Sequence, residues 1–106
     1  MSARLPRKIP AVISFPPESA RQDAWGWMEE LSVSRVRLLT LCVLRQDERL
    51  FLNFSIGGRR LGPAPARIAR AEKDGDGFFR AEAVFTDEVF KRELSSAILR
   101  ALAAAA

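Results

Sequence analysis

Short runs in which apolar and polar residues alternate make up most of the chain before Phe85. The clearest run covers residues 50–56, where every second residue is large and apolar: Leu50, Leu52, Phe54 and Ile56. A period of two is typical of a strand with one buried face. Five further strands are predicted by weaker patterns at residues 11–15, 25–31, 36–40, 66–72 and 78–85.

Turn-forming residues separate these runs. Pro16-Pro17 ends the first run, residues 45–49 are entirely polar, and Gly57-Gly58 follows the fourth run. Residues 73–77, Lys-Asp-Gly-Asp-Gly, favour a tight hairpin because Asp-Gly readily supplies a positive φ. Their two carboxylates have calcium-loop spacing, but Phe85 stands where such a loop has its bidentate glutamate, so a hairpin is the better interpretation.

The last segment is predicted to be a helix at residues 86–103. Thr86 can cap it, and acidic residues follow in the first turn. One apolar stripe recurs at steps of three and four: Val89, Phe90, Leu94, Ala97, Ile98, Ala101 and Leu102. The fold class expected is all-β, a six-stranded antiparallel barrel with one C-terminal helix. We expect one domain over 1–106, with an irregular basic arm at 1–10, the barrel at 11–85 and then the helix.

Composition narrows the class of protein. A chain of 106 residues with 48% hydrophobic and 28% charged residues suits one soluble domain. No apolar run approaches the ~20 residues of a membrane span, and charges and prolines interrupt the start where a secretory signal would lie. We therefore expect a cytoplasmic protein. Cys42 is the only cysteine, which excludes an internal disulfide and favours a buried or half-buried apolar role.

The chain has neither histidine nor tyrosine. The commonest general base and the Ser-His and Cys-His nucleophile pairs are therefore missing, and we expect neither an enzyme nor a cofactor. The net charge is +4, and the first ten residues contain three cations, Arg4, Arg7 and Lys8, without an acid. A basic surface of this kind favours anionic partners.

Two polar motifs carry the candidate chemistry. Arg4-Leu-Pro-Arg-Lys8 precedes the first predicted strand, and Glu30-Leu-Ser-Val-Ser-Arg35 lies between the second and third. They resemble the Arg-x-x-x-Arg and Asp/Asn-x-Ser-x-x-Gly motifs of the PilZ family, and the later strands, the Asp-Gly hairpin and residues 85–87 resemble the rest of that family. The resemblance implies a six-stranded barrel and a non-enzymatic bacterial receptor for cyclic di-GMP that acts through a protein partner.

The resemblance implies a ligand-binding set made of Arg4, Arg7, Lys8, Glu30, Ser32 and Arg35. A cyclic dinucleotide presents phosphates and guanine edges, which planar guanidinium groups recognise in pairs of hydrogen bonds. Lys8 stands at the second arginine position, Glu30 is one methylene longer than aspartate, and Arg35 replaces glycine. We therefore expect weakened binding of cyclic di-GMP, or an adaptor that has lost the ligand. The partner, the pathway and the oligomeric state stay open.

Several alternatives accompany this interpretation. Arg45–Arg49 followed by Asn53–Gly58 matches both motifs better, but its spacing favours a solvated turn and an exposed strand face. Glu29 and Glu30 are adjacent in a strand and are expected on opposite faces, which excludes a carboxylate pair. Trp25 and Trp27 share one face, where core packing is favoured over base stacking or a partner-binding patch. The alternative function is a small basic β-barrel that binds single-stranded nucleic acid, although acids are interleaved with the cations and nucleic acid is not the expected partner.

Overall fold

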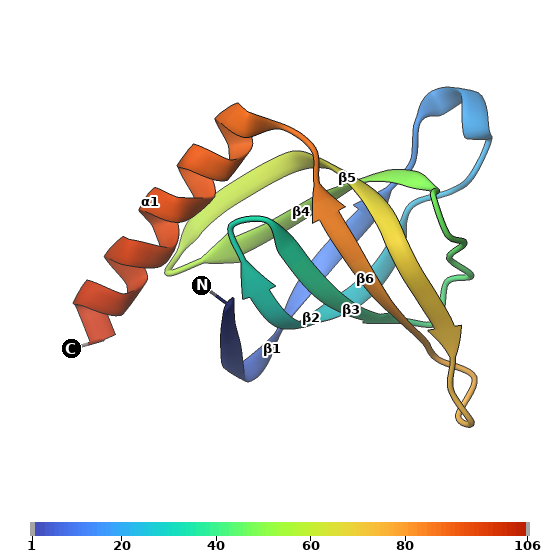
Figure 1. The fold of residues 1–106 in the computed structure, drawn as a ribbon, viewed down its shortest axis with the longest axis horizontal. Helices are drawn as coiled ribbons and strands as arrows, with labels where there is room; N and C mark the ends of the chain where they lie inside the picture. The colour runs from blue at the N-terminus through green and yellow to red at the C-terminus, as the bar shows by residue number, and fades with distance from the viewer. Residues whose placement is uncertain (1, 106) are drawn as a thin grey trace.

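The computed structural model describes residues 2–105, with the backbone alone for residues 2–7 and 105. Six antiparallel strands close into a barrel in the order β1-β2-β3-β6-β5-β4, and a helix follows the last strand (Figure 1). The predicted fold class is confirmed. The elements are β1 (Ser2–Ser14), a short 3-10 helix η1 (Pro17–Ser19), β2 (Ala24–Ser32), β3 (Arg35–Thr40), β4 (Arg49–Ile56), β5 (Arg59–Lys73), β6 (Phe79–Phe85) and α1 (Glu88–Ala105).

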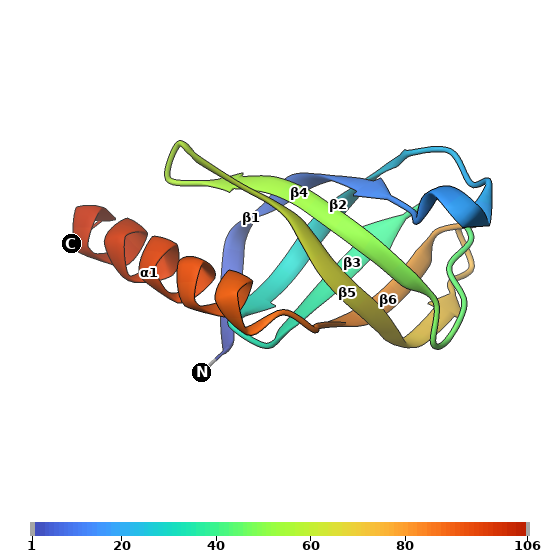
Figure 2. The same cartoon turned by 90° about the horizontal axis from the view of Figure 1, so that it is seen from above.

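The core fills the barrel and continues under α1. The alternation in β4 turns Leu50, Leu52 and Phe54 inward, and each is at most 5% exposed. Phe90 of α1 lies edge-on to Phe54, with ring centroids 6.2 Å apart, so the helix closes one end of the barrel. The C-terminal end of α1 extends past the strands (Figure 2).

The buried stripe of α1 is narrower than predicted. Phe90, Leu94 and Ala97 are buried, whereas Val89 is 61% and Leu102 is 53% exposed. The end of the barrel offers a small area, and only the side chains that point straight at it lose contact with water.

The prediction of an irregular arm at residues 1–10 is wrong, because β1 begins at Ser2 and includes residues 2–10. Ser2 lies opposite Ser32 and Arg4 opposite Glu30, and regular pairing resumes at Ile9 after an irregularity. Pairing satisfies backbone groups at the end of β2 that would otherwise need water. Pro6 falls within the irregular stretch, where a missing N–H is tolerated.

Strand β5 is also longer than expected, because it begins at Arg59, before the predicted run at residues 66–72. Gly62 and Pro63 stand opposite Asn53, at a break in the register between Leu52 and Phe54. Gly62 has a φ of +116°, and a Cβ there would lie 2.5 Å from the Leu52 carbonyl oxygen. Only glycine fits such a close approach of two backbones.

Strand β2 departs from the expected face assignments in two ways. Trp25 and Trp27 point out of the barrel and are 71% and 45% exposed, so the core-packing interpretation is wrong. The interior side belongs to Gly26 and Met28, and even a Cβ on Gly26 would come within 3.1 Å of the Ile13 side chain. The barrel therefore has no room for indoles there.

A β-bulge overturns the expectation that Glu29 and Glu30 face opposite ways. Pairing between β2 and β3 passes from Met28 directly to Glu30, so Glu29 is the inserted residue. A bulge of this kind turns two successive side chains toward one side of the sheet. Both glutamates form ion pairs with arginines on the outer surface of the barrel.

Candidate functional site

The corner between β2 and β3 is held by the side chain of Ser32. Its Oγ accepts hydrogen bonds from the backbone N–H groups of Arg35, at 3.0 Å, and Ser34, at 3.3 Å. Ser32 is only 7% exposed. Serine hydroxyls commonly stabilise tight turns in this way. Ser32, expected to meet a ligand, is thus engaged in fixing the turn.

Arg35 occupies the position at which the PilZ motif has glycine. Ala20 and Asp47 are the non-glycine residues with positive φ in the described chain, so the backbone at Arg35 needs no glycine. The Arg35 side chain is exposed and forms an ion pair with Glu82 of β6. The replacement therefore costs the turn nothing and adds a cation at the rim.

Three of the six predicted site residues line one hollow of about 180 Å³, here called the corner hollow. Its described lining is Glu30, Leu31, Ser32, Arg35, Val36, Arg37 and Glu82. An oxygen of Glu30 lies 3.4 Å from a guanidinium nitrogen of Arg37. The hollow thus contains two arginines and two carboxylates, and each arginine already has an acidic partner.

Lys8 lies on the outer surface but is not part of the described lining of the corner hollow. Its Nζ is 3.8 Å from Glu29 Oε2, while Nε of Arg80 donates to Glu29 Oε1 at 3.0 Å. The hydrogen bond from Arg80 holds the pKa of Glu29 below its ordinary value, against the opposing effect of burial. Lys8 is therefore drawn into a separate cluster with Glu29 and Arg80.

The arm residues Arg4 and Arg7 belong to β1, and their side chains lie outside the described residues. The backbone of Arg4 is paired with that of Glu30, and Ser2 with Ser32, so the basic segment runs directly beside the corner. Figures 1 and 2 both show the start of β1 next to the β2–β3 turn. The two motifs singled out in the sequence therefore lie side by side.

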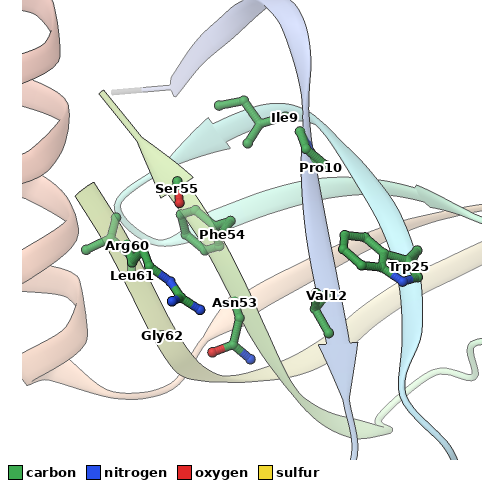
Figure 3. Close-up of a pocket in the computed structure, with 10 residues that line it drawn as sticks. All are labelled: Ile9, Pro10, Val12, Trp25, Asn53, Phe54, Ser55, Arg60, Leu61 and Gly62. Carbon is green, nitrogen blue, oxygen red and sulfur yellow. The ribbon is translucent and has the colours of Figure 1, made fainter. Parts of the chain in front are cut away.

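The second match to the motifs lies elsewhere on the barrel. Arg45 is exposed in the turn before β4 and Arg49 at its first residue, and Asn53 and Ser55 lie on its outer face, as predicted. Two of these residues also border a hollow. Asn53 and Ser55 line a hollow of about 460 Å³ over β1, β4 and β5, here called the outer groove (Figure 3).

Sequence reasoning missed Arg37, Glu82 and Arg80 as neighbours of the candidate site. Alternation in residues 79–85 indicated that positions 80 and 82 share a face, but the pairing of β6 with β3 joins residues that are 39 to 49 positions apart in the chain. That pairing sets Arg37 opposite Glu82. Short-range patterns carry no signal for such a contact.

No group of three or more His, Cys, Asp or Glu side chains gathers as a metal site among the described residues. Residues 74–78 form the predicted hairpin turn, in which Asp74 Oδ1 accepts backbone N–H groups of Asp76 and Phe78. Cys42 is half-buried, as predicted, and burial raises the pKa of its thiol. Within the described chain, no helix combines the length and apolar character that crossing a membrane requires.

No protein-family model matches the sequence, and no curated protein matches it. Solved structures do match. The PilZ domain of YcgR from Escherichia coli with c-di-GMP aligns with a TM-score of 0.68 at 14% identity, over 99% of this chain and 91% of that one. The PilZ domain of CeSA from a cellulose-synthesizing bacterium aligns with a TM-score of 0.61 at 23% identity, over 88% and 89%.

The inhibitor of motility MotI/DgrA of Bacillus subtilis aligns with a TM-score of 0.68 at 12% identity, over 96% of this chain. The chain spans half the length of that protein. The alignments with the two PilZ domains cover most of the six-stranded barrel and the helix that follows it. The chain therefore has the fold of a PilZ domain.

Proposed function

We propose that this protein is a non-enzymatic bacterial signalling module that binds cyclic di-GMP weakly at the corner hollow and acts through a protein partner. The observation that supports the proposal is the pairing of Arg4 with Glu30 and of Ser2 with Ser32. This pairing sets a segment with three cations beside a hollow bounded by Arg35 and Arg37. A cytoplasmic location belongs to the same proposal.

The recognition chemistry follows from the charges of these residues. Arg4 and Arg7 would supply guanidinium groups for a phosphate or a guanine edge, and Arg35 would meet the ligand from the β2–β3 turn. Ser32 would act indirectly, by holding the turn that presents Arg35. Glu30 and Lys8 would stand at the border of the bound ligand.

The ion pairs of the corner argue for low affinity. A phosphate that approaches Arg35 or Arg37 must compete with Glu82 or Glu30 for the same guanidinium group. Each exposed pair is worth up to about 1 kcal/mol, so the competition lowers affinity without abolishing it. If the carboxylates outcompete the phosphate entirely, the protein does not bind the ligand and is an adaptor that works through its partner alone.

Binding of single-stranded nucleic acid is less well supported. Ion pairs with acids engage Lys8, Arg35, Arg37, Arg67 and Arg80, which divides the basic surface among local neighbours. A continuous basic track, which such proteins need along the strand, is not formed by these residues.

Isothermal titration with cyclic di-GMP tests the proposal. We expect a dissociation constant of about 10–100 μM. Arg4→Ala should abolish the heat of binding, whereas Arg92→Ala, which removes an exposed cation of α1, should leave it unchanged. If the wild type gives no heat of binding at about 1 mM cyclic di-GMP, the receptor role is contradicted. The protein would then act only as an adaptor for its partner.

A further inference from the structure

The outer groove is the largest hollow described above, and the proposed function does not use it. It runs over β1 and β4, with β2 and β5 at its margins (Figure 3). Its volume of about 460 Å³ falls within the range of sites that bind small molecules, ~300–1,000 Å³. It shares no described lining residue with the corner hollow.

The strand register sets an aromatic wall opposite an amide across the groove. Trp25, Val12 and Asn53 stand directly opposite one another on β2, β1 and β4. Neighbouring strands lie ~4.8 Å apart, so the backbones of Trp25 and Asn53 are separated by ~10 Å, with Val12 as the floor between them. Trp25 is 71% exposed, and its indole borders the groove. A flat ring has room to rest on Val12 against the indole.

Three polar side chains are gathered at the other margin: Asn53, Ser55 and Arg60. Ser55 is paired with Arg60 across β4 and β5, and Asn53 is two residues away on the same face of β4. In Figure 3 the guanidinium group of Arg60 extends toward the carboxamide of Asn53. Among the described residues, none of these three side chains takes part in a hydrogen bond or an ion pair.

The charge in the described lining of the groove is positive only. Arg60 is the charged residue of its described lining, and no carboxylate accompanies it there. An anionic group would therefore meet Arg60 without displacing an internal partner, unlike at the corner hollow. Gly62 leaves room for the Asn53 side chain beside the groove, since a Cβ on Gly62 would lie 2.8 Å from Asn53 Oδ1.

We propose that the outer groove is a second binding site, for a planar aromatic ligand that carries a phosphate, the chemical class of a mononucleotide. The ring stacks on the indole of Trp25 above Val12, and the carboxamide of Asn53 meets its hydrogen-bonding edge. The phosphate pairs with the guanidinium group of Arg60, with the Ser55 hydroxyl beside it. This site is independent of the proposed binding of cyclic di-GMP at the corner hollow.

Tryptophan fluorescence provides the test. In a Trp27→Phe background the remaining indole is Trp25, so titration with adenosine or guanosine monophosphate should quench the emission saturably, with a dissociation constant below about 1 mM. Arg60→Ala should weaken binding by about tenfold or more, because it removes the charge that pairs with phosphate. Arg59→Ala is the matched control, because this neighbouring exposed arginine is not part of the groove lining, and it should leave affinity unchanged.

Two further ligands test the contributions of the ring and of the phosphate separately. Adenosine alone lacks the anion and inorganic phosphate alone lacks the ring, so we expect each to bind at least about tenfold more weakly than the nucleotide. The proposal is overturned if no nucleotide quenches saturably, or if Arg60→Ala binds like the wild type. It is also overturned if Arg35→Ala, at the corner hollow, abolishes nucleotide binding. Thermal unfolding of each variant verifies that it is folded.

Discussion

The outer face over β2, β3 and β6 and the outer face over β1 and β4 use similar residue types in opposite ways. On the first face, each arginine that borders the corner hollow is held by a carboxylate. On the second, Arg60 lies beside an amide and a hydroxyl, and no acid lines the groove. A motif therefore predicts which side chains are present but not whether they are available to a ligand.

Strand register accounts for the difference. Pairing of β3 with its two neighbours sets Arg37 opposite Glu30 on one side and opposite Glu82 on the other. Pairing of β4 with β5 instead sets Ser55 opposite Arg60. Opposite charges on facing positions neutralise each other, whereas a hydroxyl leaves the guanidinium charge exposed.

The largest effect is expected from closing the space at Gly62, at the edge of the outer groove. Gly62→Ala would place a Cβ 2.5 Å from a backbone oxygen at a φ of +116°, so we expect a loss of about 3 kcal/mol in the free energy of unfolding. Urea denaturation measures this loss. Gly58→Ala is the matched control, since its φ is +81° and nothing lies within 4 Å of the added Cβ. Equal losses in the two variants would show that the strands do not approach closely at Gly62.

A smaller effect is expected from removing the two carboxylates that line the corner hollow. The double variant Glu30→Gln/Glu82→Gln removes the acidic partners of Arg37 and Arg35, so cyclic di-GMP should bind about tenfold more tightly, a change of ~1.4 kcal/mol. Titration calorimetry measures the change. Glu93→Gln, on the exposed face of α1, removes a carboxylate remote from the site and should have no effect. An unchanged affinity in the double variant would mean that these pairs do not limit binding.

A smaller effect depends on pH. The folded protein holds the pKa of Glu29 below the ordinary value of 4.5, so folding favours the charged carboxylate. The resulting stability is fully present above that value and is lost as pH falls through the lowered pKa. Glu29→Gln should therefore cost about 0.5–1 kcal/mol at pH 7 and progressively less as the pH falls below 4.5. A series of denaturation curves from pH 7 downward measures this, and a cost independent of pH would contradict the role of charge.

The smallest effect on stability is expected from removing the indole of Trp25, which borders the outer groove. Trp25 is 71% exposed, so Trp25→Ala should change the free energy of unfolding by less than about 0.5 kcal/mol. Met28 lies on the same strand but is fully buried, and Met28→Ala should cost about 3 kcal/mol. Thermal denaturation compares the two. A large loss from Trp25→Ala would place the indole in the core after all.

Much of the fold could be predicted from local patterns. Alternation in residues 50–56 and the Asp-Gly hairpin gave β4 and the β5–β6 turn, because both signals depend on neighbouring residues alone. The start of β1 could not be predicted, since its pairing depends on the backbone left exposed at the end of β2. A charged segment interrupted by proline carries no local sign of that partner.

The candidate site was predictable in position but not in electrostatics. The alternation at Trp25 and Trp27 identified a shared face, but a period of two does not say which face is inward. The bulge at Glu29 then brought two adjacent glutamates to one surface. Long-range pairing supplied Glu82 as the partner of Arg35. The outward face of the tryptophans, the bulge and the Arg35–Glu82 ion pair all depend on packing between distant segments.

The most direct test of the account is an NMR titration of the labelled protein with cyclic di-GMP. We predict that the amide signals of residues 2–4, 30–37 and 80–84 shift together, at lower ligand concentrations than the indole N–H signal of Trp25. Shifts centred on Trp25, Asn53 and Arg60, with the β2–β3 turn unchanged, would contradict the assignment of the dinucleotide to the corner hollow.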